Sequence, residues 1–202
     1  MMVSSFIQTC IACNIGILTT YPLETLKSRK IMNTNNINLY KGVEAPLLLG
    51  GLSNGIRLHT FNSLKDDSFI LALLTSGLLN GMMLVPYELY KLSKQSGKKY
   101  ITFKGSNIVL IKELLGTIIQ LTLYSNLETD NTIVNLLFGG LSSVFAMTFV
   151  YPLDVIYVNH MLYDYTYLFI LKNIDLWIGY KYQLLRCFLG YGITLSIISN
   201  IN

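Results

Sequence analysis

The stretch YPLETLK at Tyr21–Lys27 returns twice along the chain, as VPYELYK at Val85–Lys91 and as YPLDVIY at Tyr151–Tyr157. Each copy keeps the proline and an acid two residues later, and each proline ends a long apolar run. Pro86 follows Pro22 by 64 residues, and Pro152 follows Pro86 by 66. Self-similarity at a long, nearly fixed period indicates a repeated structural unit. We therefore expect three repeats, at approximately 1–65, 66–130 and 131–202.

The composition is more apolar than that of a soluble domain. Of the 202 residues, 52% are hydrophobic and only 13% are charged, whereas charged residues make up about 25% of soluble domains. The apolar residues form six blocks of roughly the length that spans a bilayer as a helix. These blocks lie at about 3–21, 43–61, 68–86, 106–127, 133–151 and 182–201. We predict one all-α membrane domain over 1–202, with six transmembrane helices.

Basic residues gather on one side of the predicted helices. Eleven of the fifteen lysines and arginines lie between a proline and the next span, at Lys27, Arg29, Lys30, Lys41, Lys91, Lys94, Lys98, Lys99, Lys104, Lys172 and Lys181. The opposite connections hold Lys65 among four acids, namely Asp66, Asp67, Glu128 and Asp130. The positive-inside rule places the proline side inward. The net charge of +4 then reflects helix ends beside anionic lipid, and no nucleic-acid partner is expected.

An aromatic residue and a glycine open the second helix of each repeat. The pairs are Tyr40 with Gly42, Phe103 with Gly105, and Trp177 with Gly179. Together with the three proline motifs and the six spans, this pattern resembles the mitochondrial carrier family over essentially the whole chain. The resemblance implies a pseudo-threefold carrier fold, a monomer, and the mitochondrial inner membrane, with another host or organelle membrane as the alternative. The abundance of Asn, Ile, Lys and Tyr is typical of AT-rich coding, so a compact viral carrier-like protein is one interpretation.

The proline motifs supply a candidate inner gate. A proline inside a helix removes a hydrogen bond and kinks the helix, so three such helices can converge. The resemblance implies that the acid of one repeat pairs with the base of another, and the candidates are Glu24 with Lys91, Asp154 with Lys27, Glu88 with the hydroxyl of Tyr157, and Gln95 as a glutamine brace. The alternative is that these charges extend from helix ends toward water, which we accept for Lys30, Lys94 and Lys98.

Bases inside the even spans supply a candidate substrate site, because an ionisable residue within a span usually lines a water-filled path. By the resemblance, the contact positions fall on Leu49, Lys112 and Arg186, and Glu113 and Arg57 lie nearby. Three bases over one acid leave a net charge of about +2, which favours a polyanion such as a nucleotide. The pair of Lys112 and Glu113 instead resembles the amino-acid contact of the family. An internal ion pair for these two residues, and packing or lipid contact for Arg186, remain open.

We expect transport of small anionic metabolites by alternating access, with nucleotides favoured and an amino-acid or carboxylate carrier as the alternative. A second alternative is a degenerate carrier that acts as a membrane adaptor. It is favoured by the short inward loops and by a weak outer gate, where few ionic links can form and hydrogen bonds from Asn62, Ser125 and Tyr124 are the substitutes. An enzyme, a cofactor and a metal site are not expected.

Membrane lipid is the expected second partner. The backbone amides at Gly42, Gly105 and Gly179 open predicted helices, and helix N-termini attract phosphate. We therefore expect cardiolipin at these three positions.

Overall fold

The computed structural model describes the chain apart from residues 1, 34–37, 98–104, 128, 130 and 200–202. Every regular element of the described part is a helix, which confirms the predicted all-α class. The elements are α1 (Met2–Met32), η1 (Pro46–Gly50), α2 (Gly51–Leu64), α3 (Phe69–Ser96), α4 (Ser106–Leu127), α5 (Thr132–Tyr163), α6 (Tyr167–Asn173) and α7 (Tyr180–Ser199). Several residues named above lie outside the described part, namely Lys98, Lys99, Phe103, Lys104, Glu128 and Asp130.

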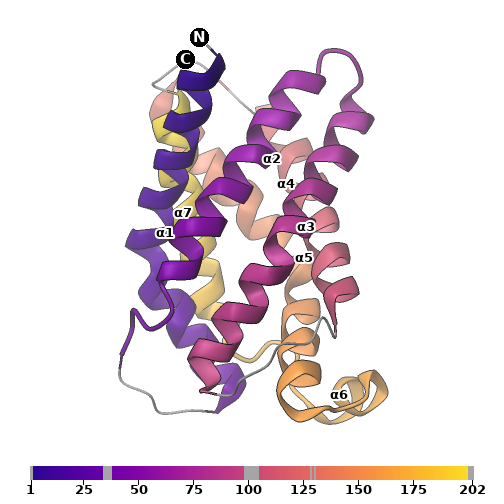
Figure 1. The fold of residues 1–202 in the computed structure, drawn as a ribbon. Helices are drawn as coiled ribbons and strands as arrows, with labels where there is room; N and C mark the ends of the chain where they lie inside the picture. Colours follow the sequence, from indigo (N-terminus) through magenta and orange to yellow (C-terminus); the bar gives the residue numbers. More distant parts are fainter. Residues whose placement is uncertain (1, 34–37, 98–104, 128, 130, 200–202) are drawn as a thin grey trace.

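The long helices stand around a closed ring (Figure 1). Helix α1 packs against α2 and α7, α3 joins α2 to α4, and α5 joins α4 to α7. The π-helix η1 runs directly into α2, whereas α6 packs against α5 outside the ring. Helices α1, α3 and α5 finish at the same end of the ring, which we call the proline end (Figure 1).

Four helices of the described part are long and apolar enough to cross a membrane, over Phe6–Met32, Phe69–Ser96, Ser106–Leu127 and Ile133–Tyr163. The other two predicted spans, at 43–61 and 182–201, correspond to η1 with α2 and to α7. That these two segments cross a membrane stays a prediction.

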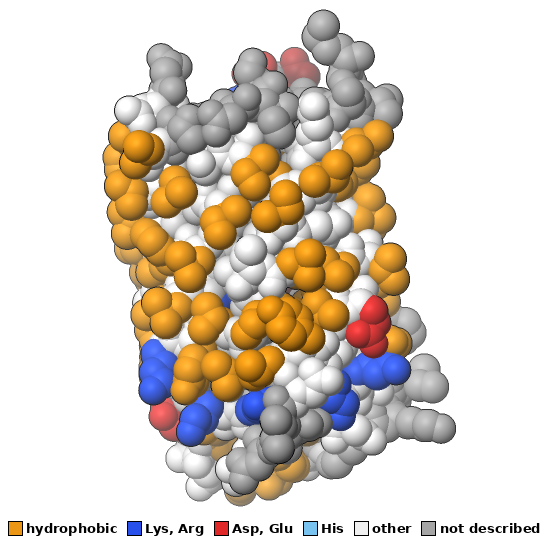
Figure 2. All heavy atoms as spheres, turned by 90° about the vertical axis from the view of Figure 1, so that its left-hand side faces the viewer, with side chains coloured by type: hydrophobic (Ala, Val, Ile, Leu, Met, Phe, Trp, Pro, Cys, Tyr) orange, Lys and Arg blue, Asp and Glu red, His pale blue; other side chains and the backbone are white. Residues whose placement is uncertain are grey.

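The outer surface of the ring is apolar. Exposed side chains recur at helical spacing, as on α5 at Leu137, Leu141, Phe145 and Phe149. Figure 2 shows apolar side chains over most of one face, with lysines and arginines in a band toward its lower end. Polar side chains such as Ser76 and Asn80 are buried instead. This arrangement, apolar outside and polar inside, suits helices that are surrounded by lipid.

The odd helices do not stop where their apolar runs stop. Pro22, Pro86 and Pro152 lie inside α1, α3 and α5, which continue to Met32, Ser96 and Tyr163. Charged residues that follow the prolines, such as Lys27, Lys91 and Asp154, are buried in the fold, so a hydropathy window ends before the helix does.

The third connection between paired helices holds a short helix that the sequence did not predict. The hydroxyl of Thr166 accepts a hydrogen bond from the amide of Phe169 and begins α6. Ile170 is buried beneath the helix, while Leu168 and Leu171 stay exposed. The longer separation of proline and glycine in this repeat, from Pro152 to Gly179, makes room for it.

Two tyrosines explain why the proline motif and the glycine motif occur together. Tyr21 stacks on Tyr40 and donates to the carbonyl of Lys41, directly before Gly42. Tyr151 stacks on Trp177 and donates to the carbonyl of Ile178, directly before Gly179. Gly42, Gly105 and Gly179 share a left-handed backbone, with φ of 83°, 75° and 81°, a conformation that glycine adopts without strain.

Helices α1 and α7 pack closely at Gly16, and this contact can be tested. A methyl group there would lie 2.7 Å from the backbone oxygen of Gly190. We expect Gly16→Ala to reduce the free energy of unfolding by about 1–3 kcal/mol, measured by denaturant titration in detergent. Gly116→Ala is the matched control, because the nearest atom to its added methyl, on Val150, is 3.9 Å away. Equal losses in the two variants would contradict the close packing.

Candidate functional site

A polar cavity lies inside the ring of helices. Its volume is about 110 Å³, and it is open to solvent. Each ring helix contributes to its wall, for example through Ile17, Asn54, Leu84, Gly116, Met147 and Tyr191. Among the described residues, eight charged side chains line it: Glu24, Lys27, Arg57, Glu88, Lys112, Glu113, Asp154 and Arg186. The sequence singled out all eight as gate or cavity residues.

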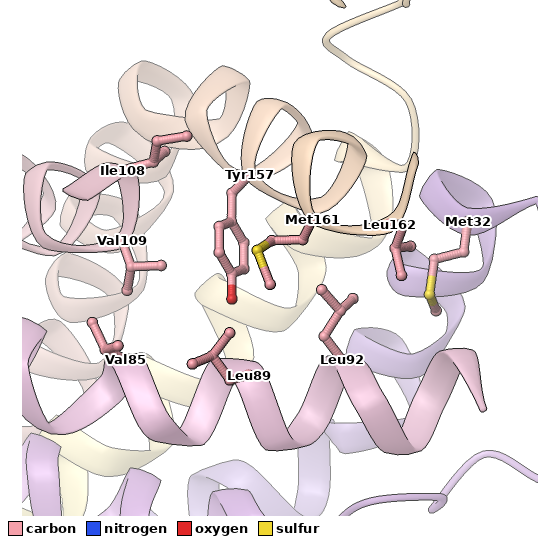
Figure 3. Packing of buried hydrophobic residues seen from close by; sticks show 9 residues of the cluster. All are labelled: Met32, Val85, Leu89, Leu92, Ile108, Val109, Tyr157, Met161 and Leu162. Atoms are coloured by element: carbon pink, nitrogen blue, oxygen red, sulfur yellow. The ribbon is translucent and has the colours of Figure 1, made fainter. Parts of the chain in front are cut away.

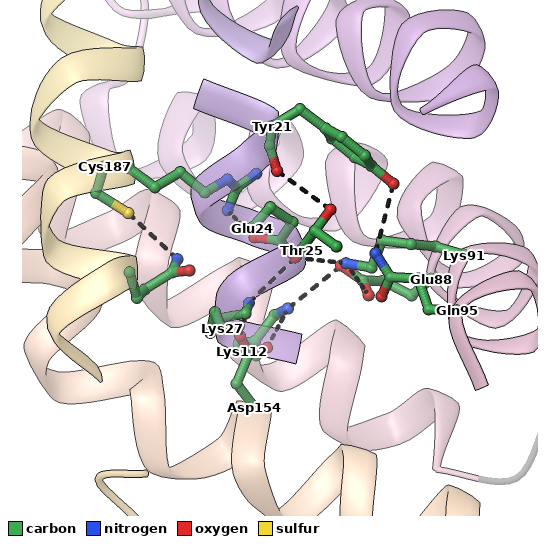
Figure 4. Close-up of polar contacts among 12 residues, drawn as sticks. Tyr21, Glu24, Thr25, Lys27, Glu88, Lys91, Gln95, Lys112, Asp154 and Cys187 are labelled. Carbon is green, nitrogen blue, oxygen red and sulfur yellow. Dashed lines mark hydrogen bonds and ion pairs between the residues drawn. The ribbon is translucent and has the colours of Figure 1, made fainter. Parts of the chain in front are cut away.

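Both ion pairs predicted for the inner gate form at the proline end (Figure 4). The ammonium of Lys91 lies 2.9 Å from Oε1 of Glu24, and that of Lys27 lies 3.0 Å from Oδ2 of Asp154. Lys27 also lies 3.2 Å from Glu24. All four residues are buried, so these charges depend on one another because little water reaches them.

The third predicted gate contact, between Glu88 and Tyr157, was wrong. The hydroxyl of Tyr157 is buried without a hydrogen-bond partner in the described part of the chain. Glu88 instead pairs with Lys91 at 2.7 Å and lies 3.9 Å from the ammonium of Lys112. A phenol cannot neutralise a carboxylate, and two nearby lysines do.

The third proline motif has Tyr157 where the other two have a lysine. Lys112, from α4, supplies the third base instead. Its ammonium donates to Oδ1 of Asp154 at 2.8 Å and lies 3.2 Å from Glu113. Acids and bases therefore alternate around a closed ring, hereafter the charge ring, in the order Glu24, Lys27, Asp154, Lys112, Glu88, Lys91 and back to Glu24. Lys112 thus belongs to the charge ring as well as to the cavity wall.

An apolar cluster closes the proline end beyond the charge ring (Figure 3). Met161 and Leu162 follow Asp154 by seven and eight residues on α5, so they lie roughly 10 Å farther along the helix. They pack with Met32 from α1 and Leu92 from α3. The charges are thereby separated from solvent on this side.

Gln95 does not contact the charge ring through any hydrogen bond in the described part of the chain. Its amide donates to the hydroxyl of Tyr21 at 3.4 Å and so ties the end of α3 to α1. Gln95 thus joins α3 to α1, and the contact is made with Tyr21 of the first proline motif.

Arg186 extends the charge ring into the cavity. Its Nη1 lies 2.9 Å from Oε2 of Glu24, and 29% of its side chain is exposed. Glu113 likewise faces the cavity and contacts the charge ring. It forms an ion pair with Lys112 and accepts a hydrogen bond from the amide of Asn80 at 2.9 Å.

Leu49 is not part of the cavity wall in the described structure. It packs beside Ala45, Leu84 and Tyr87. The π-helix η1 changes the register of this segment, because each of its turns is wider than an α-turn. Pro46 and Gly50 line the cavity instead, so a position counted along an ideal α-helix misses the wall.

Arg57 lies in a different half of the cavity. Its Nη1 donates to Oε1 of Gln120 at 3.1 Å, and its Cζ lies 5.4 Å from the centre of the Tyr191 ring. Gln120 follows Lys112 by eight residues on α4, which is about 12 Å along the helix. This group therefore stands well apart from the charge ring.

Some polar side chains of the site were missed from the sequence, among them Asn80, Asn54 and Tyr191. Asn80 holds Glu113, and Asn54 accepts from the hydroxyl of Tyr191 at 3.4 Å. A polar residue within an apolar span often faces an interior path, and that signal could have identified all three.

Comparison with protein-family models finds no match for the sequence, and comparison with curated proteins finds none either.

The pairing of Glu24 with Lys91 can be measured by a double-mutant cycle. Glu24→Gln and Lys91→Gln should each destabilise the protein, since each leaves a buried charge with one partner fewer. The two losses should be non-additive by about 0.5–3 kcal/mol, measured by denaturant unfolding in detergent. Lys30→Gln, at an exposed site on α1, is the control and should combine additively with Glu24→Gln. Additive losses from Glu24 and Lys91 would exclude the pair.

Proposed function

We propose that this chain is a membrane solute carrier, similar to the mitochondrial carrier family, that moves small anionic metabolites by alternating access. The observation that carries the proposal is a charged cavity closed at one end by ion pairs between helices. Such pairs can open and re-form without covalent change, so they suit a gate. The proposal includes six spans in three related repeats, a monomer, and the mitochondrial inner membrane, with another host or organelle membrane as the alternative.

Access from the proline end requires the charge ring and the apolar cluster behind it to separate. The opposite end has a weaker candidate gate. The hydroxyl of Ser125 is bonded within its own helix, and Asn62 is exposed. This imbalance is the observation that favours the adaptor alternative, in which the ring never opens.

The class of anion follows from charge. The sequence favours nucleotides, because three bases face one acid. The ion pairs of Lys112 and Arg186 reduce the free positive charge in the cavity, which supports a solute with fewer negative groups, such as a carboxylate or an amino acid.

Uptake into liposomes tests the proposal. We expect the protein to take up at least one member of a panel of nucleotides, carboxylates and amino acids. Arg186→Ala should abolish uptake without unfolding the protein, because Glu24 keeps Lys27 and Lys91 as partners. Arg186→Lys should recover only part of the activity, since it lacks the two-pronged guanidinium. A folded protein that transports nothing would favour the adaptor.

Glu113→Gln separates the substrate classes in the same assay. A nucleotide carrier should tolerate or gain from the loss of a negative charge near the anion. An amino-acid carrier should fail, because the ammonium group of its substrate loses a partner.

We also propose that cardiolipin binds at Gly42, Gly105 and Gly179. Gly105 and Gly179 directly precede α4 and α7, and helix N-termini attract phosphate. Added cardiolipin should raise the melting temperature of the detergent-solubilised protein more than a zwitterionic lipid does. Equal effects of the two lipids would contradict this proposal.

A further inference from the structure

Arg57 carries a positive charge that no acid of the described residues neutralises. The residue is 2% exposed. One guanidinium nitrogen, Nη1, donates to Gln120. The other two, Nε and Nη2, are buried without a hydrogen-bond partner in the described part of the chain.

The remaining charges of the cavity and the charge ring cancel. Four acids, Glu24, Glu88, Glu113 and Asp154, are joined by ion pairs to four bases, Lys27, Lys91, Lys112 and Arg186. Among the described residues of this site, Arg57 is therefore the base left over. The net charge of the site is about +1 rather than the +2 that the sequence alone indicated, because Lys112 and Arg186 are already paired.

The two free nitrogens of Arg57 form a docking edge. Nε and Nη2 lie on the same side of the planar guanidinium, so their N–H groups are nearly parallel. Two parallel donors match the two oxygens of a carboxylate or of a phosphate group. The donor that Gln120 occupies is on a different edge, so an anion could bind without displacing it.

The surroundings hold this edge in place without neutralising it. Tyr191 covers the guanidinium at 5.4 Å and is itself bonded to Asn54. Gly50 and Gly116 line the same cavity and carry no side chain to fill it. An unpaired buried charge is costly in a membrane protein and usually marks a functional position.

We propose that Arg57 is the primary anion-binding residue of the cavity and takes a single carboxylate or phosphate group of the solute. This inference rests on the proposed carrier function and narrows it. It moves the anion from Arg186, which Glu24 already occupies, to the half of the cavity about 12 Å from the charge ring. It also favours a solute with one unmatched negative group over a polyanion.

Anion-dependent thermal stability tests the inference. Purified protein in phospholipid-free detergent is titrated with acetate and with inorganic phosphate, with sodium chloride at equal ionic strength as the reference. At least one of the two anions should raise the melting temperature of the unsubstituted protein, and the stronger one identifies the group. Arg57→Met should weaken the apparent affinity at least about tenfold. Arg57→Lys, which keeps the charge and loses the paired donors, should give an intermediate value.

Stability without anion separates a binding role from a structural one. Arg57→Met should melt at a higher temperature than the unsubstituted protein when no anion is added, because an unpaired buried charge has been replaced by an apolar side chain of similar length. Lys30→Met changes the net charge equally at an exposed site and should leave the anion response unchanged.

A lower melting temperature of Arg57→Met together with an unchanged anion response would overturn the inference and assign Arg57 to packing. The absence of any stabilisation of the unsubstituted protein by either anion would also overturn it. Neither result decides the carrier proposal, which is judged separately by uptake into liposomes. Uptake by Arg57→Met at the unsubstituted rate would leave the carrier proposal standing and remove Arg57 from it.

Discussion

The closed ring of alternating charges is the constraint on which the rest of the structure depends. Charges that are taken out of water need opposite charges at close range, and here every acid of the ring touches two bases. Those partners come from four helices, so α1, α3, α4 and α5 can satisfy them only by meeting at one end. The helices can then separate toward the other end, which leaves the cavity. The apolar cluster around Leu92 and Met161 follows from the same convergence.

Much of this site could be predicted from the sequence, because buried charges have few possible partners. Glu24 with Lys91 and Asp154 with Lys27 follow from a motif repeated at a nearly fixed period. The failures have a common physical origin. The place of Glu88 and Lys112 depends on how far α4 is shifted along α3 and α5, and Leu49 depends on one π-helical segment. Neither a helix shift nor a π-turn leaves a pattern in side-chain periodicity.

The fold was predicted to a similar extent and for a related reason. Hydropathy located the helices, since their lipid-facing surfaces are apolar at regular spacing, as from Leu137 to Phe149 on α5. It misplaced the ends of the odd helices, because it treats a charged residue as exposed. The stacking of Tyr21 on Tyr40 and of Tyr151 on Trp177 shows that a proline motif contacts the glycine motif that follows it. Their co-occurrence in sequence reflects that contact.

The cavity wall and the charge ring share residues, and this bears on how a bound solute could act on the ring. Arg186 and Glu113 face the cavity while they hold Glu24 and Lys112 of the charge ring. A solute shifts a conformational equilibrium only through a difference in its affinity for the two states. A solute anchored at Arg57 whose other end competes for Arg186 or Glu113 would remove a partner from the ring and lower the cost of opening it. A solute that reached Arg57 alone would bind without loosening the ring. In a carrier built this way, the length of the solute beyond its anionic group decides whether binding leads to transport.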